Sequence, residues 1–207
     1  MNNLVADAIA RLNGDGTEQN PGSTFLVDDE NNPKILEVRN GVLIFANFAG
    51  RANKFGKESK NFNVIITPEL KAKFENGFFK NIKGEPLQVK VHSYGKGEED
   101  DPDVYYINVK INMTVKYPPQ VTLYTDYDGR KSKTSLTDET IGCLDRIDMK
   151  RCDFKVNVKE SQAREGWAVF YLRKFDCQQF KSPDYGGAYA DWDDDPLAED
   201  VPGNPED

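Results

Sequence analysis

The sequence has few of the residues that build metal sites and disulfide frameworks. It contains one histidine, His92, and three cysteines, Cys143, Cys152 and Cys177. An odd cysteine count without a C-x-x-C spacing argues against a disulfide framework and favours a reducing compartment. One histidine and three scattered cysteines do not form a zinc-ligand pattern either. We therefore expect no metal, no cofactor and no disulfide.

Segments that would direct the chain to a membrane are also missing. No stretch approaches the ~18 apolar residues of a membrane span. The first twelve residues lack the basic start and apolar run of a signal peptide. These absences predict a soluble, intracellular protein with no membrane partner.

Signatures of catalysis are equally scarce. The sequence has neither the G-x-x-x-x-G-K-[ST] phosphate loop nor a zinc-deaminase signature, and no Cys or Ser has an obvious base partner. His92 is better explained as a surface strand residue than as a catalyst. We therefore expect a protein that is not an enzyme.

Net positive charge is absent too, but the acidic residues are segregated. The net charge is −8, with 27 basic and 35 acidic residues, and an acidic protein is ordinarily a poor partner for nucleic acid. Nine of the acidic residues lie between Asp184 and Asp207, a stretch without Lys or Arg. Five more lie in the run Glu98–Asp103. Without both segments, basic residues exceed acidic ones by six, so the rest of the chain is mildly basic.

The acidic C-terminal segment, residues 182–207, predicts a disordered tail. Prolines and paired glycines interrupt it, and its high charge with few aliphatic residues cannot offset the entropy of ordering. It also contains aromatic residues, including Trp192 beside Asp193, Asp194 and Asp195. Such a tail could occupy a cationic cleft, or dock on partner proteins, or simply keep the protein soluble.

Alternation of apolar and polar residues predicts strands through most of the remaining chain. It is clearest over residues 105–117, where seven apolar residues from Tyr105 to Tyr117 share one face. Shorter segments of the same kind lie at 35–48, 62–66, 87–91, 121–125 and 154–158. Residues 167–175 are apolar on both faces until Arg173, which suits a central or closing strand.

Helical spacing is limited to short segments. Apolar residues between Leu4 and Leu12 favour a short amphipathic helix, although a frayed terminus would also fit. Thr137–Thr140 resembles a capping box before Ile141, Leu144 and Ile147. A second short helix is plausible over residues 68–79. The chain therefore predicts an all-β fold with one or two short helices, either a Greek-key barrel of OB type or a sandwich.

This pattern divides the chain into three parts. We expect an N-terminal helix and linker at 1–24, an OB-like domain at 25–181 and the acidic tail at 182–207.

The segment between the strands near residues 45 and 62 carries the strongest binding signal. It interleaves aromatic rings with cations, and two glycines give it freedom. Single-stranded nucleic acid uses this mixture, because cations follow the phosphates and flat rings stack on bases. A solvated hairpin held by Phe55 is the alternative, and Phe62 fits the core. The candidate contacts here are Asn47, Phe48, Arg51, Lys54, Phe55, Lys57 and Lys60.

Two further regions repeat this chemistry. Lys90, His92 and Tyr94 share one predicted strand face, and Tyr106, Lys110 and Lys116 share another. Each face is a possible binding platform or an ordinary solvated surface. A second basic loop contains Arg130, Lys131 and Lys133, with Tyr124 and Tyr127 nearby.

The acidic run Glu98–Asp103 has two readings. Carboxylates bind Mg²⁺ or Ca²⁺, but an acidic hairpin tip that discourages strand pairing explains the run better.

Two stretches carry a more particular pattern. One is Leu43-Ile-Phe-Ala-Asn-Phe-Ala-Gly50, followed by a basic loop and then Asn61-Phe-Asn-Val-Ile-Ile66. The other is Leu136-Thr-Asp-Glu-Thr-Ile-Gly-Cys-Leu-Asp145, followed by the strands at 152–159 and 167–175. Over about residues 35–178 the chain resembles a family of small single-stranded-DNA-binding proteins of tailed bacteriophages. That family has a pattern like F-R-N-F-x-G, a basic glycine-containing loop, and D-E-x-x-G-x-L-D.

The resemblance implies an OB-fold barrel that binds single-stranded DNA (ssDNA) without chemistry, beside a phage replisome or recombination system. We expect a monomer or dimer in the host cytoplasm. It would place Asn47, Phe48, Arg51, Lys54 and Phe55 in or near the groove, while Ala46 replaces the Arg of the pattern. The tail resembles those of bacterial and T7-type single-strand binders, which recruit replication proteins. Those tails commonly end in an aromatic residue, and this one ends in Asp207.

The sequence thus favours sequence-tolerant coating of ssDNA in phage DNA replication or recombination, with a tail that tunes affinity and recruits partners. The rival function is a protein–protein adaptor or phage structural protein without specific ssDNA binding. A nuclease that uses the acidic run is a distant third.

Overall fold

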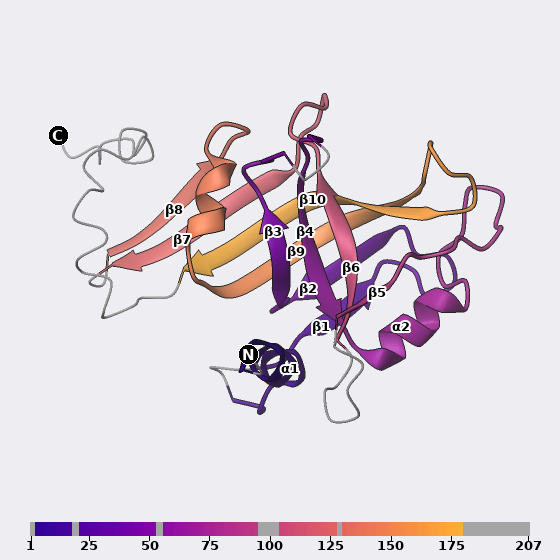
Figure 1. The fold of residues 1–207 in the computed structure, drawn as a ribbon, viewed down its shortest axis with the longest axis horizontal. Helices are drawn as coiled ribbons and strands as arrows, with labels where there is room; N and C mark the ends of the chain where they lie inside the picture. The colour runs from indigo at the N-terminus through magenta and orange to yellow at the C-terminus, as the bar shows by residue number, and fades with distance from the viewer. Residues whose placement is uncertain (1–2, 18–20, 53–55, 95–103, 128–129, 180–207) are drawn as a thin grey trace.

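Strands dominate the computed structural model, which describes residues 3–17, 21–52, 56–94, 104–127 and 130–179 (Figure 1). Two α-helices and one 3-10 helix accompany ten strands in this part of the chain. In chain order the elements are α1 (Asn3–Asn13), β1 (Thr24–Val27), β2 (Ile35–Arg39), β3 (Leu43–Asn47), β4 (Lys60–Ile66), α2 (Pro68–Glu75), β5 (His92–Tyr94), β6 (Val104–Ile111), β7 (Gln120–Tyr127), β8 (Arg130–Leu136), η1 (Ile141–Arg146), β9 (Met149–Glu160) and β10 (Ala168–Gln179).

One bent segment closes the sheet into a barrel. The strand order is β1-β2-β9-β10-β6-β4-β3, so β2 and β3 lie at distant points of the path although they are consecutive in sequence. Asn40, at φ 53°, turns the chain between them. Just after the turn, the Gly41 N–H donates to Cys152 O (2.7 Å), while Val42 O accepts from Ile65 N–H (3.0 Å). Residues 35–47 therefore pair with β9 at one end and β4 at the other, which confirms the predicted OB-like, all-β fold.

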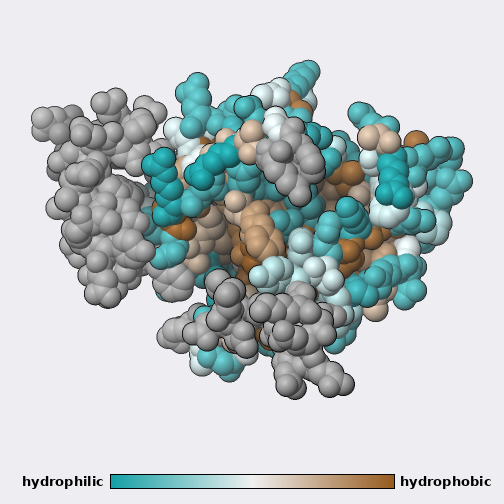
Figure 2. All heavy atoms as spheres, in the orientation of Figure 1, coloured by the Kyte–Doolittle hydropathy of each residue, from teal (hydrophilic) through white to brown (hydrophobic). Residues whose placement is uncertain are grey.

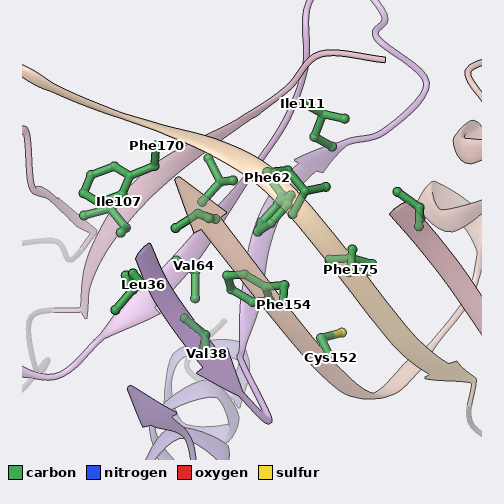
Figure 3. Packing of buried hydrophobic residues seen from close by; sticks show 14 of the residues in the cluster. Leu36, Val38, Phe62, Val64, Ile107, Ile111, Cys152, Phe154, Phe170 and Phe175 are labelled. Carbon is green, nitrogen blue, oxygen red and sulfur yellow. The ribbon is translucent and has the colours of Figure 1, made fainter. Parts of the chain in front are cut away.

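Aromatic residues fill the barrel. Phe62 from β4 packs edge-on against Phe154 from β9, with 5.2 Å between ring centroids, and lies 5.5 Å from Phe175 of β10 (Figure 3). All three are almost fully buried. They sit at inward positions of their strands, since alternate side chains face opposite sides of a sheet. The prediction that Phe62 belongs to the core is confirmed.

A hairpin and two helices lie outside the closed ring of strands. The hairpin β7–β8 follows β6, and β7 runs parallel to β10 from the Lys174–Gln120 pair onward. Helix α1 packs through Ala8 and Leu12 on Ile65 and Val104, at one end of the outer face of β4 and β6. Helix α2 begins at Pro68 after Thr67, whose hydroxyl accepts the Leu70 N–H. Both helices were predicted.

The long strand predicted over 105–117 is wrong at its C-terminal half, because β6 ends at Ile111. The Asn112 side chain accepts hydrogen bonds from the N–H and hydroxyl of Thr114 at 3.1 and 3.0 Å. A side chain that bonds its own backbone in this way replaces ladder pairing with a turn. Lys116 therefore does not share a strand face with Tyr106 and Lys110.

Four smaller differences have local causes. The helix predicted after Thr137 is the 3-10 helix Ile141–Arg146 rather than an α-helix, and of the two capping-box bonds Thr140 Oγ1 accepts the Thr137 N–H at 2.9 Å. Residues 87–91 make only an isolated bridge from Gln88 to Trp167, although Leu87 and Val89 are buried. The supposed basic loop at 130–133 begins strand β8, and the supposed linker at 13–24 ends in β1.

None of the described helices is long and apolar enough to span a membrane.

The barrel closure predicts a strict size limit at Gly41. A Cβ placed there would lie 2.6 Å from Phe154 Cε1 and 3.1 Å from Val38 Cγ1. Because close-packed cores tolerate little added volume, Gly41→Ala should lower the free energy of unfolding by about 1–3 kcal/mol. Urea denaturation measures this loss. Ser135→Ala, an exposed change on β8, is the control and should shift stability by less than ~0.5 kcal/mol. Equal stability of Gly41→Ala and the wild type would contradict this closure.

Candidate nucleic-acid interface

The outer face of β3, β4, β5 and β6 brings together three of the predicted contact residues, Tyr94, Tyr106 and Lys110. Inward positions of β4 and β6 fill the core, so their alternate residues point outward. Register places Asn61 opposite Lys110, Asn63 opposite Asn108 and Ile65 opposite Tyr106. Figure 2 shows this side of the molecule, where an apolar patch near the centre is framed by hydrophilic side chains.

Four rings gather on this face and form what we call the ring cluster: Phe45, His92, Tyr94 and Tyr106. The Phe45 ring lies edge-on to Tyr94 and Tyr106, at centroid distances of 5.5 and 5.9 Å. His92 stacks on Tyr106 at 5.2 Å with only 10° between the ring planes. Phe45 is 57% exposed and Tyr94 51% exposed, so two large rings face solvent. Exposed, mutually supported rings are what unstacked bases bind.

A β-bulge presents Phe45. Ile44 pairs with Asn63 and Asn47 pairs with Asn61 on β4. Two residues of β3, Phe45 and Ala46, therefore lie opposite the one residue of β4 between Asn61 and Asn63. Phe45 has φ 49°, a left-handed conformation that is uncommon for a bulky residue. Bulges redirect side chains, and strained backbone concentrates at functional sites.

His92 contributes a flat ring rather than a charge. Partial burial lowers its pKa, and the nearby positive charge of Lys90 lowers it further. The imidazole is therefore neutral at pH 7, which lets it lie on Tyr106 without the cost of a desolvated cation.

A row of amides continues the face beyond the ring cluster. Asn108 Nδ2 donates to Asn63 Oδ1 at 3.0 Å and to Asn61 Oδ1 at 3.2 Å. Asn63 Nδ2 in turn donates to Phe45 O at 3.4 Å. These bonds fix the three amides across two strands, so the face between the rings and Lys110 is polar but uncharged.

Cations border the amide row. Lys110 is exposed on β6 and has no ion-pair partner within the described ranges. Lys90 is exposed just before β5, and Lys57 is exposed in the loop before β4. Arg51 is 69% exposed at its side chain and lies 4.0 Å from Asp145. The face can therefore attract phosphates along its edges while offering rings at its centre.

Three predicted contact residues have structural roles instead. Phe48 is fully buried and its ring stacks on Phe62, with 5.7 Å between the ring centroids. Its placement in the groove was therefore wrong, because the ring packs in the apolar core. Lys60 is paired with Asp138, and its Nζ also donates to Asp138 O at 2.7 Å, so its charge is already compensated. Asn47 bonds the backbone of Arg51 and Ser59, which closes the loop between β3 and β4.

The remaining candidates lie elsewhere. Lys131 is exposed on β8, and Arg130 begins that strand, so neither belongs to the ring-cluster face. Lys54, Phe55, Trp192, Asp193, Asp194 and Asp195 lie outside the described residues, as does the acidic run 98–103.

Sequence reasoning missed Phe45, Asn63 and Asn108 and undervalued His92. The period-two spacing of Tyr106, Asn108 and Lys110 was a usable signal for Asn108. For Phe45 no such signal exists, because its outward direction comes from the bulge.

The two distinctive sequence stretches are in direct contact. Asp145 Oδ1 accepts the Phe48 N–H at 2.8 Å, and Oδ2 accepts the Ala49 N–H at 3.0 Å. Gly142 approaches so closely that a Cβ there would lie 3.1 Å from Ala49 Cβ. Asp145, only 8% exposed at its side chain, thus fixes the start of the loop that carries Arg51 and Lys57.

Removal of this carboxylate should therefore loosen the loop. Asp145→Ala leaves two backbone N–H groups without their acceptor, which should cost about 1–3 kcal/mol of stability. Denaturation and amide exchange measure the change, and exchange should accelerate at Phe48 and Ala49. The matched control is Asp148→Ala, an exposed carboxylate three residues away. Unchanged exchange at both amides would show that Asp145 does not hold the loop.

Comparisons with known proteins identify the family of the chain. No curated protein sequence matches the chain significantly. Among solved structures, the chain is similar to the single-stranded DNA-binding protein from bacteriophage Enc34, at 10% identity and a TM-score of 0.41, covering 83% of this chain and 98% of that one. The same phage protein in complex with ssDNA matches at 10% identity and a TM-score of 0.39, covering 78% and 97%. A family model described as "Putative phage ssDNA-binding domain" matches residues 29–190. The chain therefore belongs to this family of phage ssDNA-binding domains.

Proposed function

We propose that this protein binds ssDNA, without sequence preference, along the ring-cluster face. The observation that carries the proposal is the set of exposed rings, Phe45 and Tyr94 against Tyr106, beside fixed amides and Lys110. Every base has a flat face, so stacking on rings tolerates any sequence. Bases in a duplex already stack on one another, and the face should therefore prefer unpaired strands.

The position of the face within the fold supports the same proposal. It lies on the second and third strands of the barrel, β4 and β6, next to the loop that joins the first two. In OB folds this surface and this loop are the usual site for oligonucleotides and oligosaccharides. Membership of a family of ssDNA-binding domains favours the nucleic acid.

Phosphates would follow the cations at the border of the face. Lys110, Lys90 and Arg51 are exposed, and the chain outside its two acidic segments is mildly basic. Contacts of this kind release counterions, so affinity should fall as salt rises.

The proposal is one of binding alone. Rings, amides and lysines recognise a strand without breaking a bond, and the histidine of the face is engaged in stacking on Tyr106. We place this activity in the host cytoplasm, in phage DNA replication or recombination, with the protein acting as a monomer or dimer.

The acidic tail would regulate this binding. A polyanion near the domain competes with DNA for the same cations, and its aromatic residues offer a docking point for replication or recombination proteins. The support is the charge segregation of the sequence, nine carboxylates without a basic residue between Asp184 and Asp207.

Loss of a ring tests the proposed function. Phe45→Ala or Tyr94→Ala should each weaken binding of oligo-dT about 10-fold, because one base stack is worth roughly 1–3 kcal/mol. Fluorescence titration at fixed low salt measures the affinity, with a duplex of equal length for comparison. Ile82→Ala, which removes a side chain that is 98% exposed in another part of the surface, is the control and should change nothing. Wild-type affinity in both ring variants, or equal affinity for the duplex, would sink the proposal.

Truncation tests the tail. Deletion of residues 182–207 should tighten oligo-dT binding at low salt, with a difference that fades as salt screens the charges. Titrations of both proteins at two salt concentrations make the comparison. Weaker binding by the truncated protein would rule out competition.

A further inference from the structure

The outer face of the barrel continues past Lys110 to a second surface. Lys110 on β6 pairs with Tyr171 on β10, Tyr171 pairs with Asn157 on β9, and Asn157 pairs with Ile35 on β2. These residues form one outward row around the barrel. Adjacent strands lie about 4.8 Å apart, so β9 is only about 10 Å from β6 along this row.

A groove of about 770 Å³ lies at the far end of the row. Its walls come from three places: the outer positions of β2, β9 and β10, the strand β1, and the loop that joins β6 to β7. Its volume is in the range of small-ligand sites, about 300–1,000 Å³. Its lining includes one aromatic ring, Tyr117, and three cations, Lys155, Arg173 and Lys174.

One aromatic ring and one cation of this groove are exposed to solvent. Tyr117 is 80% exposed, with Lys116 Nζ 5.3 Å from its ring centroid. Arg173 sits at the register shift between Leu172 and Lys174, where β10 bulges against β9. It is exposed and makes no ion pair with any residue in the described part of the chain. A bulge aims such a side chain away from the regular sheet direction.

The carboxylates of the groove are already engaged. Glu37 pairs with Lys155 at 2.6 Å and with Arg39 at 2.9 Å, and these cations hold its pKa below the usual range. Asp28 accepts the N–H groups of Lys34 and Ile35, both at 2.9 Å. Of the three cations in the lining, Lys155 pairs with Glu37 and Lys174 pairs with Asp176. Arg173 is therefore the lining cation that has no ion-pair partner among the described residues.

We propose that this groove binds a second segment of the same ssDNA strand, an inference that rests on the proposed function of the ring-cluster face. A base would stack on Tyr117, while a phosphate lies against Arg173. The strand would reach it across Lys110 and Tyr171. The continuity of the outward row favours DNA over a protein partner, because one path then joins both surfaces.

The test compares two oligonucleotide lengths. A dT oligomer of about 6 nucleotides fills one surface, and one of about 16 is long enough for both. The double variant Tyr117→Ala/Arg173→Ala should bind the long oligomer about 10-fold more weakly and the short one with less than about a 2-fold change. For the long oligomer, the slope of log K against log salt should also become less steep, by about the release of one counterion. Both side chains are exposed, so the fold should persist, and thermal unfolding checks this.

A matched control removes the same kinds of side chain elsewhere. Ile82→Ala/Lys83→Ala takes away one exposed apolar group and one exposed cation, and should leave both affinities unchanged. Tyr117→Phe with Arg173 intact should retain long-oligomer affinity, because a phenyl ring still stacks.

The outcomes separate the two proposals. If Phe45→Ala weakens both oligomers but the groove variant weakens neither, the groove inference is overturned and the proposed function stands. If Phe45→Ala weakens neither oligomer, the proposed function fails, whatever the groove variant does. Equal losses for short and long oligomers in the groove variant would also overturn the inference, since they would make the groove part of the first site.

Discussion

The ring-cluster face depends on the double role of one segment, residues 35–47. Its first half pairs with β9 and its second half with β4, so a bend at Asn40–Gly41 closes the barrel. The bulge at the end of this segment then turns Phe45 outward, while Phe48, three residues later, is buried among core rings. The bend that closes the barrel, the bulge at Phe45 and the buried Phe48 ring therefore depend on one another. Because the Asp145 carboxylate holds the N–H groups of Phe48 and Ala49, the 3-10 helix η1 secures that arrangement from the other side of the chain.

Acidic and basic residues occupy different parts of the chain. The acidic residues that make the whole chain negative are concentrated in two segments, and the described face combines rings and amides with isolated cations. Lysines with ion-pair partners, such as Lys60, stabilise the loops, and exposed ones, such as Lys110, remain available. Salt should affect these two kinds of lysine differently, because it weakens exposed contacts more than partly buried ion pairs.

Much of the fold follows from sequence alone, because period-two alternation is a direct consequence of strand geometry. The alternation at Phe62–Ile66 and Phe154–Val158, and the two-sided apolar run at 167–175, correctly predicted strands of a barrel. Alternation failed at Asn112, whose side chain bonds the nearby backbone. Phe48 was assigned to the groove from the interleaving of rings with cations and from the family resemblance, and neither pattern reveals that its ring is buried. Of the predicted contact residues, Tyr94, Tyr106 and Lys110 lie together on the ring-cluster face. Phe45 and the amide row emerge only from cross-strand register.

The central claim is that bases stack on Phe45, Tyr94 and Tyr106. Ultraviolet cross-linking of the full-length protein to oligo-dT, followed by peptide mapping, tests it most directly, because cross-links form between thymine and rings in contact. The structure predicts cross-links on peptides from β3, β5 and β6. Cross-links confined to β7 and β8, with none on those three strands, would contradict it.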